Sequence, residues 1–204
     1  TFKWFRQKGM STYGLTEQAF AACDAIKRAW RAAHPATVGL WGTLEQSFRD
    51  AIDNPGYVFP AGPASVVRPT FKSGKPMPWA TIIMPSGRRL CYPAPKIEKD
   101  GQISYQGVDQ YSRKWTTLRT YSGKLVENLT QAVARDVIAH NLPAVQTAGY
   151  DVLLTVHDED ITEAPDTDAY SGDALAEIMA RVPPWATGLP LAAAGFDTYF
   201  YRKD

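Results

Sequence analysis

The chain has 204 residues, of which 45% are hydrophobic and 21% are charged, a balance that excludes an intrinsically disordered protein. Its 22 basic and 21 acidic residues give a formal net charge of +1, which neither favours nor excludes a nucleic-acid partner, because a binding protein can segregate its charge. No apolar run approaches the roughly 18 residues of a membrane span, and Cys23 and Cys91 match no metal spacing. We therefore expect a soluble, cytoplasmic protein with free thiols and no membrane contact.

The first quarter of the chain predicts two helices. Apolar residues recur near the helical period from about residue 11 to residue 51, with a break at Pro35. Asn54-Pro55-Gly56 is a strong turn signal and ends the second helix. The proline-rich segment 55–95 excludes regular helix. Within it, residues 80–84 and 89–92 flank Pro85-Ser86-Gly87 and predict a β-hairpin.

The rest of the chain mixes helices and strands. Residues 96–115 predict a loop-rich excursion, and a long helix is expected over about 123–141. A buried apolar strand at 151–156 should form a hairpin with residues 161–164. A helix over about 172–182 should stop at Pro183-Pro184, and a last strand is expected over 191–201. Helices followed by mixed elements predict an α+β fold.

Three polar residues follow the predicted apolar strand. His157, Asp158 and Glu159 stand where that strand emerges, and in extended backbone Asp158 points opposite to its two neighbours. An exposed carboxylate at a strand end can hold Mg²⁺, which prefers hard oxygen ligands. A polar hairpin tip with no ligand is the other interpretation of these residues.

The long predicted helix has one polar and one apolar stripe. The polar stripe is spaced at four, three and four residues and comprises Lys124, Asn128, Gln131 and Arg135. Leu125, Leu129, Ala132, Val133 and Val137 form the opposite stripe and should face the core. Amides and cations on one face suit a nucleic-acid backbone or minor groove, although a solvated face has the same pattern.

Basic residues are concentrated between the predicted hairpin and the long helix. Phosphate contact is plausible for such a cluster, and solvated loop charge is the alternative. The cluster comprises Arg88, Arg89, Arg113, Lys114, Arg119 and Lys124.

The order of these segments resembles family A (polymerase I-like) DNA polymerases of the phage and prophage type. Ser86 to Pro93 is similar to a "PSGR-L-YP" hairpin, and 155–159 (TVHDE) matches the third catalytic motif, motif C. Segments 105–109 and 113–115, the helix segment 120–136, and 182–185 with 188–190 also follow the family pattern. The resemblance covers about residues 9–204.

The resemblance implies a fold and a function. It implies part of a right-hand polymerase, with a diverged or foreign start at 1–8, a partial helical fingers subdomain at 9–54, and an antiparallel palm subdomain at 55–204. The complete enzyme would perform template-directed nucleotidyl transfer with two Mg²⁺ ions. Its partners would be a DNA primer-template, a deoxynucleoside triphosphate and, if the enzyme is split, an N-terminal portion.

The resemblance also assigns roles to individual residues. Asp158 would ligate the metal ions, Glu159 would be an accessory acid, and His157 would contact the primer terminus. Gln131 would reach the minor groove at the terminal base pair, with Asn128 or Glu127 one turn before it. The DNA backbone would be contacted by Arg119 and Lys124.

Two departures from the family pattern bear on activity. The first metal-binding aspartate and the triphosphate-binding cations would precede Thr1, so the chain alone is expected to be inactive. Lys8 stands where a tyrosine is usual, and Asp160 replaces an apolar residue. The charge of Asp160 could disturb metal binding beside Asp158 or point to solvent.

Two other functions remain as alternatives. The chain could be a non-catalytic DNA-binding or interaction remnant of a decayed polymerase. A metal-dependent hydrolase using residues 158–160 is less favoured, because His34, His140 and His157 are the only histidines and have no clustered spacing.

Overall fold

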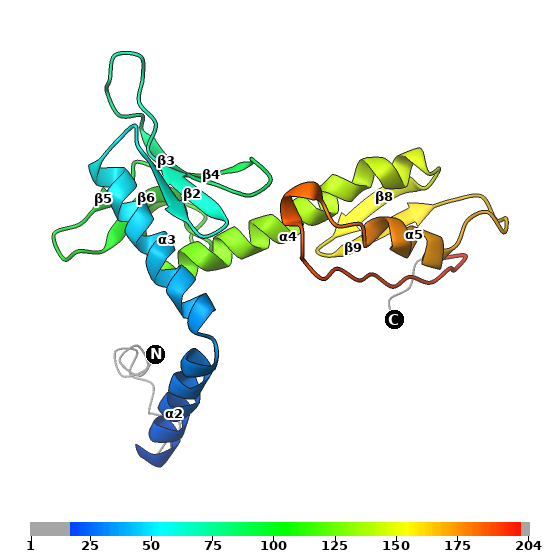
Figure 1. Ribbon diagram of the computed structural model, residues 1–204, viewed down its shortest axis with the longest axis horizontal. Helices are drawn as coiled ribbons and strands as arrows, with labels where there is room; N and C mark the ends of the chain where they lie inside the picture. The colour runs from blue at the N-terminus through cyan, green and yellow to red at the C-terminus, as the bar shows by residue number, and fades with distance from the viewer. Residues whose placement is uncertain (1–16, 201–204) are drawn as a thin grey trace. The chain divides into compact units, whose positions relative to one another are not determined.

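The computed structural model describes residues 17–200, and these residues form four α-helices and three small antiparallel sheets (Figure 1). The α+β prediction is confirmed. The chain separates into two compact units, residues 1–42 and 43–204, and the division falls inside a helix. None of the described helices is long and apolar enough to cross a membrane. Predictions for residues 1–16 and for residue 201 lie outside the described part.

The first unit contains helix α2 (Glu17–Ala33) and the start of helix α3 (Pro35–Asp53). The predicted break is confirmed: Pro35 is the first residue of α3, a position where its missing N–H costs nothing. Near the break the Trp30 ring stacks on both His34 and Trp41, with centroid distances of 4.5 and 5.8 Å. These ring contacts tie the end of α2 to the first turns of α3.

The second half of α3 belongs to the second unit and carries a buried apolar face. Leu44, Phe48 and Ala51 are fully buried, and Ser47 donates a hydrogen bond to the carbonyl of Pro60 at 2.6 Å. The helix ends at Asp53, and the Asn54 side chain donates to the carbonyl of Asp50. The turn signal at 54–56 is therefore confirmed.

A four-stranded antiparallel sheet follows, in the order β1-β2-β3-β4. The strands are β1 (Val58–Ala61), β2 (Ala64–Val67), β3 (Trp79–Ile83) and β4 (Arg89–Pro93). The β3–β4 hairpin is the one that the sequence predicts. Strands β1 and β2 have four residues each and lie in the proline-rich stretch, so no sequence pattern indicated them.

The predicted loop at 96–115 is wrong. A three-stranded antiparallel sheet begins there, with β5 (Lys96–Ile97), β6 (Ile103–Val108) and β7 (Trp115–Thr120). Only Ile103 and Ser104 of β6 are buried, so the strand lacks the apolar alternation by which strands are recognised. Polar cross-strand pairs stabilise it instead, such as Gln106 donating to the Thr117 hydroxyl at 2.8 Å.

Helix α4 (Ser122–Thr147) is longer than predicted and continues through Pro143. Its core stripe is confirmed at Leu125 and Leu129, which are buried. Beyond the proline, Val145 is fully buried in a cluster with Tyr150 and Ile178. This packing keeps the last turn helical, although a proline removes one backbone hydrogen bond.

The C-terminal part contains the hairpin of β8 (Asp151–Val156) and β9 (Glu159–Glu163), helix α5 (Gly172–Met179) and a short 3₁₀ helix at Pro184–Ala186. The hairpin is confirmed, but the expectation of a buried strand is wrong. Leu153 and Leu154 are 55% and 54% exposed, because β8 and β9 form a sheet of only two strands within the described residues. Both outer edges of this sheet are unpaired there.

The expected last strand is also wrong for residues 191–200, which adopt no strand. This segment instead passes the N-terminus of α5, where the Gly172 N–H donates to the Asp197 carboxylate at 3.1 Å. A Cβ on Gly172 would lie 2.8 Å from the Phe196 nitrogen, so only glycine permits this backbone contact. The contact anchors the segment to α5.

Candidate nucleic-acid interface

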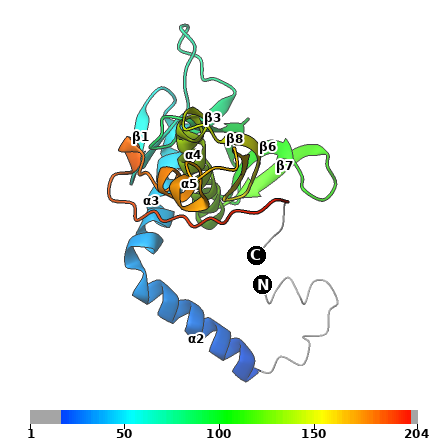
Figure 2. The same ribbon diagram turned by 90° about the vertical axis from the view of Figure 1, so that its right-hand side faces the viewer.

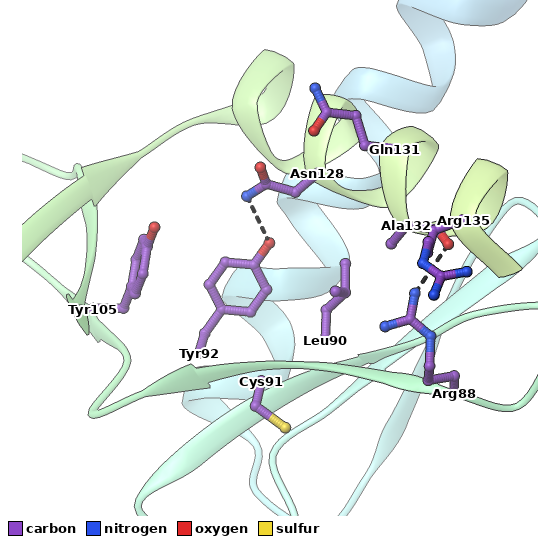
Figure 3. A pocket seen from close by; sticks show the side chains of 9 residues that line it. All are labelled: Arg88, Leu90, Cys91, Tyr92, Tyr105, Asn128, Gln131, Ala132 and Arg135. Atoms are coloured by element: carbon purple, nitrogen blue, oxygen red, sulfur yellow. Dashed lines mark hydrogen bonds between the residues drawn. The ribbon is translucent and has the colours of Figure 1, made fainter. Parts of the chain in front are cut away.

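An open groove of about 430 Å³ lies between helix α4 and strand β4 (Figure 3). Three of the four residues of the predicted polar stripe line it: Asn128, Gln131 and Arg135. Lys124, the fourth, is exposed near the start of α4 and does not line the groove. The other lining residues come from the β3–β4 turn, β4, β6 and α4, and are Arg88, Leu90, Cys91, Tyr92, Tyr105 and Ala132.

Aromatic rings form the inner wall of the groove. The Tyr92 ring makes edge-to-face contacts with Phe48 and Tyr105, each with a centroid distance of 5.0 Å. The Asn128 side-chain amide donates a hydrogen bond to the Tyr92 hydroxyl at 3.2 Å. Burial raises the pKa of Tyr92 to about 12, although the Asn128 bond acts in the opposite direction. Tyr92 is therefore a neutral hydroxyl that fixes the Asn128 amide.

The turn between β3 and β4 is attached to α4 by a buried carboxylate. Asp136 is 8% exposed and accepts hydrogen bonds from the Ser86 hydroxyl and the Arg88 guanidinium. Arg88 also donates to the carbonyl of Ala132 at 2.9 Å, as Figure 3 shows. We call Ser86, Arg88 and Asp136 the turn latch. The latch gives Arg88 a structural partner on the protein and fixes one wall of the groove.

Asp136 was missed in the sequence reasoning. A usable signal was its position between Val133 and Val137 on the core stripe of the helix, where an acidic residue needs a partner. The partner is separated from it by 48 residues, so the sequence does not reveal which cation fills this role.

Arg119 does not join the groove residues. It lies on β7 at a second depression, where it forms an ion pair with Asp100 at 2.8 Å and donates to the Gln102 side chain. In the same depression Glu45 accepts a hydrogen bond from the Ser122 N–H at 2.8 Å, which satisfies a donor at the start of α4. Hydrogen bonds between protein groups therefore dominate this second depression.

The residues of the predicted catalytic motif form the tip of the β8–β9 hairpin. Val156 pairs with Glu159, so His157 and Asp158 are the two residues of the turn. His157 has a φ of 54°, and all three side chains of the motif are exposed. The structure thus presents Asp158 to solvent at a tight turn, an arrangement open to a ligand.

The described residues do not complete a metal site. No group of three His, Cys, Asp or Glu side chains in this part of the chain could hold a metal ion. Asp158 can supply one carboxylate, and a divalent cation would need further ligands from elsewhere.

Asp160 points into the structure and not to solvent. Both of its carboxylate oxygens are buried and have no hydrogen-bond partner within the described part of the chain. Burial raises the pKa of Asp160, and the positive charge of Arg135 partly opposes this shift. Arg135 thus acts on the β8–β9 hairpin and also lines the groove.

Comparison with known proteins relates the chain to a phage DNA polymerase. The chain is 36% identical over 203 residues to the DNA polymerase of Bacillus phage SP02, an alignment that covers 97% of this chain. The chain spans only 30% of the length of that polymerase. No protein-family profile matches the chain, and no solved structure is significantly similar to it. The chain is therefore homologous to part of a phage DNA polymerase, which confirms the resemblance at this level.

Proposed function

We propose that the chain is the C-terminal part of a family A DNA polymerase and supplies the primer side of its active site. The observation that carries the proposal is the open groove beside α4, which presents the side chains of Asn128, Gln131 and Arg135. Arg135 also partly opposes the raised pKa of Asp160, a residue of the hairpin that carries Asp158. The homology to a phage DNA polymerase over almost the whole chain supports the same function.

The groove would hold the primer-template near the primer terminus. Gln131 is exposed at the rim, where its amide can reach acceptors in the minor groove. The Asn128 amide is oriented by Tyr92, which fixes the direction of its remaining hydrogen-bonding groups. His157 would contact the primer terminus and Lys124 the backbone. Arg119 could contact DNA only by exchanging its bond to Asp100.

In the complete enzyme Asp158 would be one ligand of two Mg²⁺ ions, and Glu159 an accessory acid. These ions would supply activation of the primer 3′-hydroxyl and stabilisation of the leaving pyrophosphate. A second carboxylate and the binding site for the deoxynucleoside triphosphate would come from the rest of the polymerase. We assign 9–54 to the fingers subdomain and 55–204 to the palm, and no role to 1–8.

Equilibrium binding to a labelled primer-template tests the groove. Gln131→Ala should weaken binding about tenfold, as expected for the loss of one polar base contact. Thr130→Ala is the matched control, because Thr130 is exposed on the adjacent position of α4 and does not line the groove. Equal affinities of the Gln131→Ala variant and the parent chain would contradict the proposed interface.

Primer extension tests the catalytic half of the proposal. The purified chain should extend no primer in Mg²⁺, because we place the second metal-binding carboxylate and the binding site for the triphosphate in the rest of the polymerase. Adding the remaining portion of the polymerase should restore extension, and Asp158→Ala should abolish it. Extension by the chain without a partner would overturn the assignment.

The second candidate function is a non-catalytic DNA-binding remnant. The groove lined by amide and cationic side chains fits DNA binding without catalysis as well. The same reconstitution decides between the two functions. A remnant would bind DNA through the groove but would not restore extension with any complementary portion, whatever residue stands at position 158.

A further inference from the structure

The loop between β6 and β7 carries large apolar side chains that the fold leaves in solvent. Tyr111 is 95% exposed, Trp115 is 63% exposed and Val108 is 54% exposed. Val108 pairs with Trp115 as the last pair of the β6–β7 ladder, and Tyr111 lies in the loop beyond it. In Figure 2 this loop, beyond the end of β7, extends away from helices α4 and α5. We call residues 108–115 the hairpin tip.

The hairpin tip is built as a defined turn. One carboxylate oxygen of Asp109 accepts hydrogen bonds from the backbone N–H groups of Tyr111 and Ser112, at 3.2 and 2.7 Å. The Asp109 N–H donates to the carbonyl of Lys114, and the Arg113 N–H donates to the carbonyl of Asp109, both at 2.9 Å. Such a turn needs little further ordering when a ligand binds.

The same turn directs the negative charge of the tip inward and leaves its two positive charges in solvent. The bonds from Ser112 hold the pKa of the Asp109 carboxyl below its usual range, so this group is ionised and directed at the backbone of the turn. Arg113 and Lys114 are both exposed. The outer surface of the tip therefore presents two cations beside two aromatic rings.

We propose that the hairpin tip binds single-stranded DNA, with its rings stacking on bases and its cations contacting phosphates. Exposed aromatic rings beside cations are the features by which proteins hold unpaired strands. A duplex keeps its base faces stacked internally and offers the rings no partner. An apolar protein surface would leave Arg113 and Lys114 desolvated without a counter-charge. An unpaired strand satisfies both kinds of side chain.

This site goes beyond the proposed function, because no residue of the tip lines the α4 groove. It rests on that function only for the identity of the partner as DNA. In a polymerase, a single-stranded ligand beside the primer-template would be the template strand that has not yet been copied. Binding at the groove and binding at the tip can therefore be tested independently.

The test is the affinity of the full chain for a labelled oligothymidylate and for a labelled blunt duplex. Trp115→Ala should weaken oligothymidylate binding about tenfold, and Trp115→Phe should restore most of it, because stacking needs a ring. Duplex affinity should not change with either variant. The Arg113→Ala/Lys114→Ala variant should make the salt dependence shallower by about 1.4 in slope, for two lost phosphate contacts.

The loop after β2 provides a charge-matched control. It carries Lys72, Lys75 and the exposed Phe71, so Lys72→Ala/Lys75→Ala removes the same charge from a different basic loop. This control should leave the salt slope for oligothymidylate unchanged. Unfolding midpoints equal to that of the parent chain should accompany every variant, since the replaced side chains are exposed.

Three results would overturn the proposal. Unchanged oligothymidylate binding by Trp115→Ala would remove the stacking role. Equal losses for duplex and single strand, or for the tip and the control loop, would show unspecific electrostatic binding. A change in self-association of the chain without a change in DNA binding would make the tip a protein contact. If Gln131→Ala left primer-template binding unchanged and Trp115→Ala weakened oligothymidylate binding, the groove proposal would be rejected and the tip proposal would stand.

Discussion

Removing either member of the Arg88–Asp136 pair should destabilise the second unit by an amount set by burial. Asp136 is 8% exposed, whereas the Arg88 side chain is 48% exposed. Asp136→Ala removes two hydrogen bonds to a carboxylate, one from the Arg88 guanidinium and one from the Ser86 hydroxyl, which together contribute about 2–4 kcal/mol. Water can hydrate the Arg88 cation that remains, so the loss of its partner adds little to this cost.

Arg88→Ala should cost nearly as much for a different reason. It leaves the Asp136 carboxylate buried with only the Ser86 hydroxyl as a side-chain partner, and an under-compensated buried charge is costly. We expect a loss of about 2–3 kcal/mol. For a unit of this size each kcal/mol corresponds to roughly 2–4 °C in unfolding temperature.

The double variant Arg88→Ala/Asp136→Ala removes both charges and so avoids the stranded carboxylate. Its loss of unfolding free energy should exceed that of Asp136→Ala by no more than about 1 kcal/mol. The two single losses would then sum to more than the double loss, by a coupling energy of about 1–3 kcal/mol. Urea unfolding of the four proteins measures the cycle. If the two single losses add up to the loss of the double variant to within about 0.5 kcal/mol, Arg88 and Asp136 do not stabilise each other.

Three further predictions concern other parts of the second unit. Asp160→Leu should raise the free energy of unfolding by about 1–2 kcal/mol, because it removes a buried carboxylate without a hydrogen-bond partner; a lower urea midpoint would contradict this. Burial raises the pKa of Glu45, but bonds from Arg49 and the Ser122 N–H outweigh it and hold the pKa below its usual value. Because the folded pKa is depressed, the stability advantage of the parent over Glu45→Gln should be full near neutral pH and disappear as the pH falls below about 4, which unfolding curves across pH will show. The exposed Leu153 lies on a sheet that, within the described residues, has only two strands and unpaired edges, so the chain should either associate through such an edge or be marginally stable; Leu153→Lys should then reduce association in sedimentation measurements.

Local signals predicted much of the fold. The break at Pro35, the turn at 54–56, the β3–β4 hairpin and the β8–β9 hairpin depend on residues close together in the chain, and the structure has all four. The three-stranded sheet escaped prediction because few of its strand residues are buried, namely Ile103, Ser104 and Thr120. A periodicity of apolar residues indicates burial. It predicts nothing for a strand that is stabilised by backbone hydrogen bonds and polar cross-strand pairs.

The burial of β8 was misjudged for a related reason. The run of apolar residues at 151–156 is typical of a strand covered on both faces, but Leu153 and Leu154 are more than half exposed. Sequence indicates what a strand could bury, whereas the neighbours available in the fold decide what it does bury.

The sequence by itself determined the polar stripe of α4 and the order of motifs that relates the chain to phage DNA polymerases. Both are properties of spacing along the chain, and three stripe residues do line one groove. Only the tertiary structure decided which charges are engaged. It paired Arg88 with Asp136 and Arg119 with Asp100, and it buried the carboxylate oxygens of Asp160. The physical reason is that the partner of a charged side chain is selected by proximity in space, and the Arg88–Asp136 pair joins residues 48 positions apart.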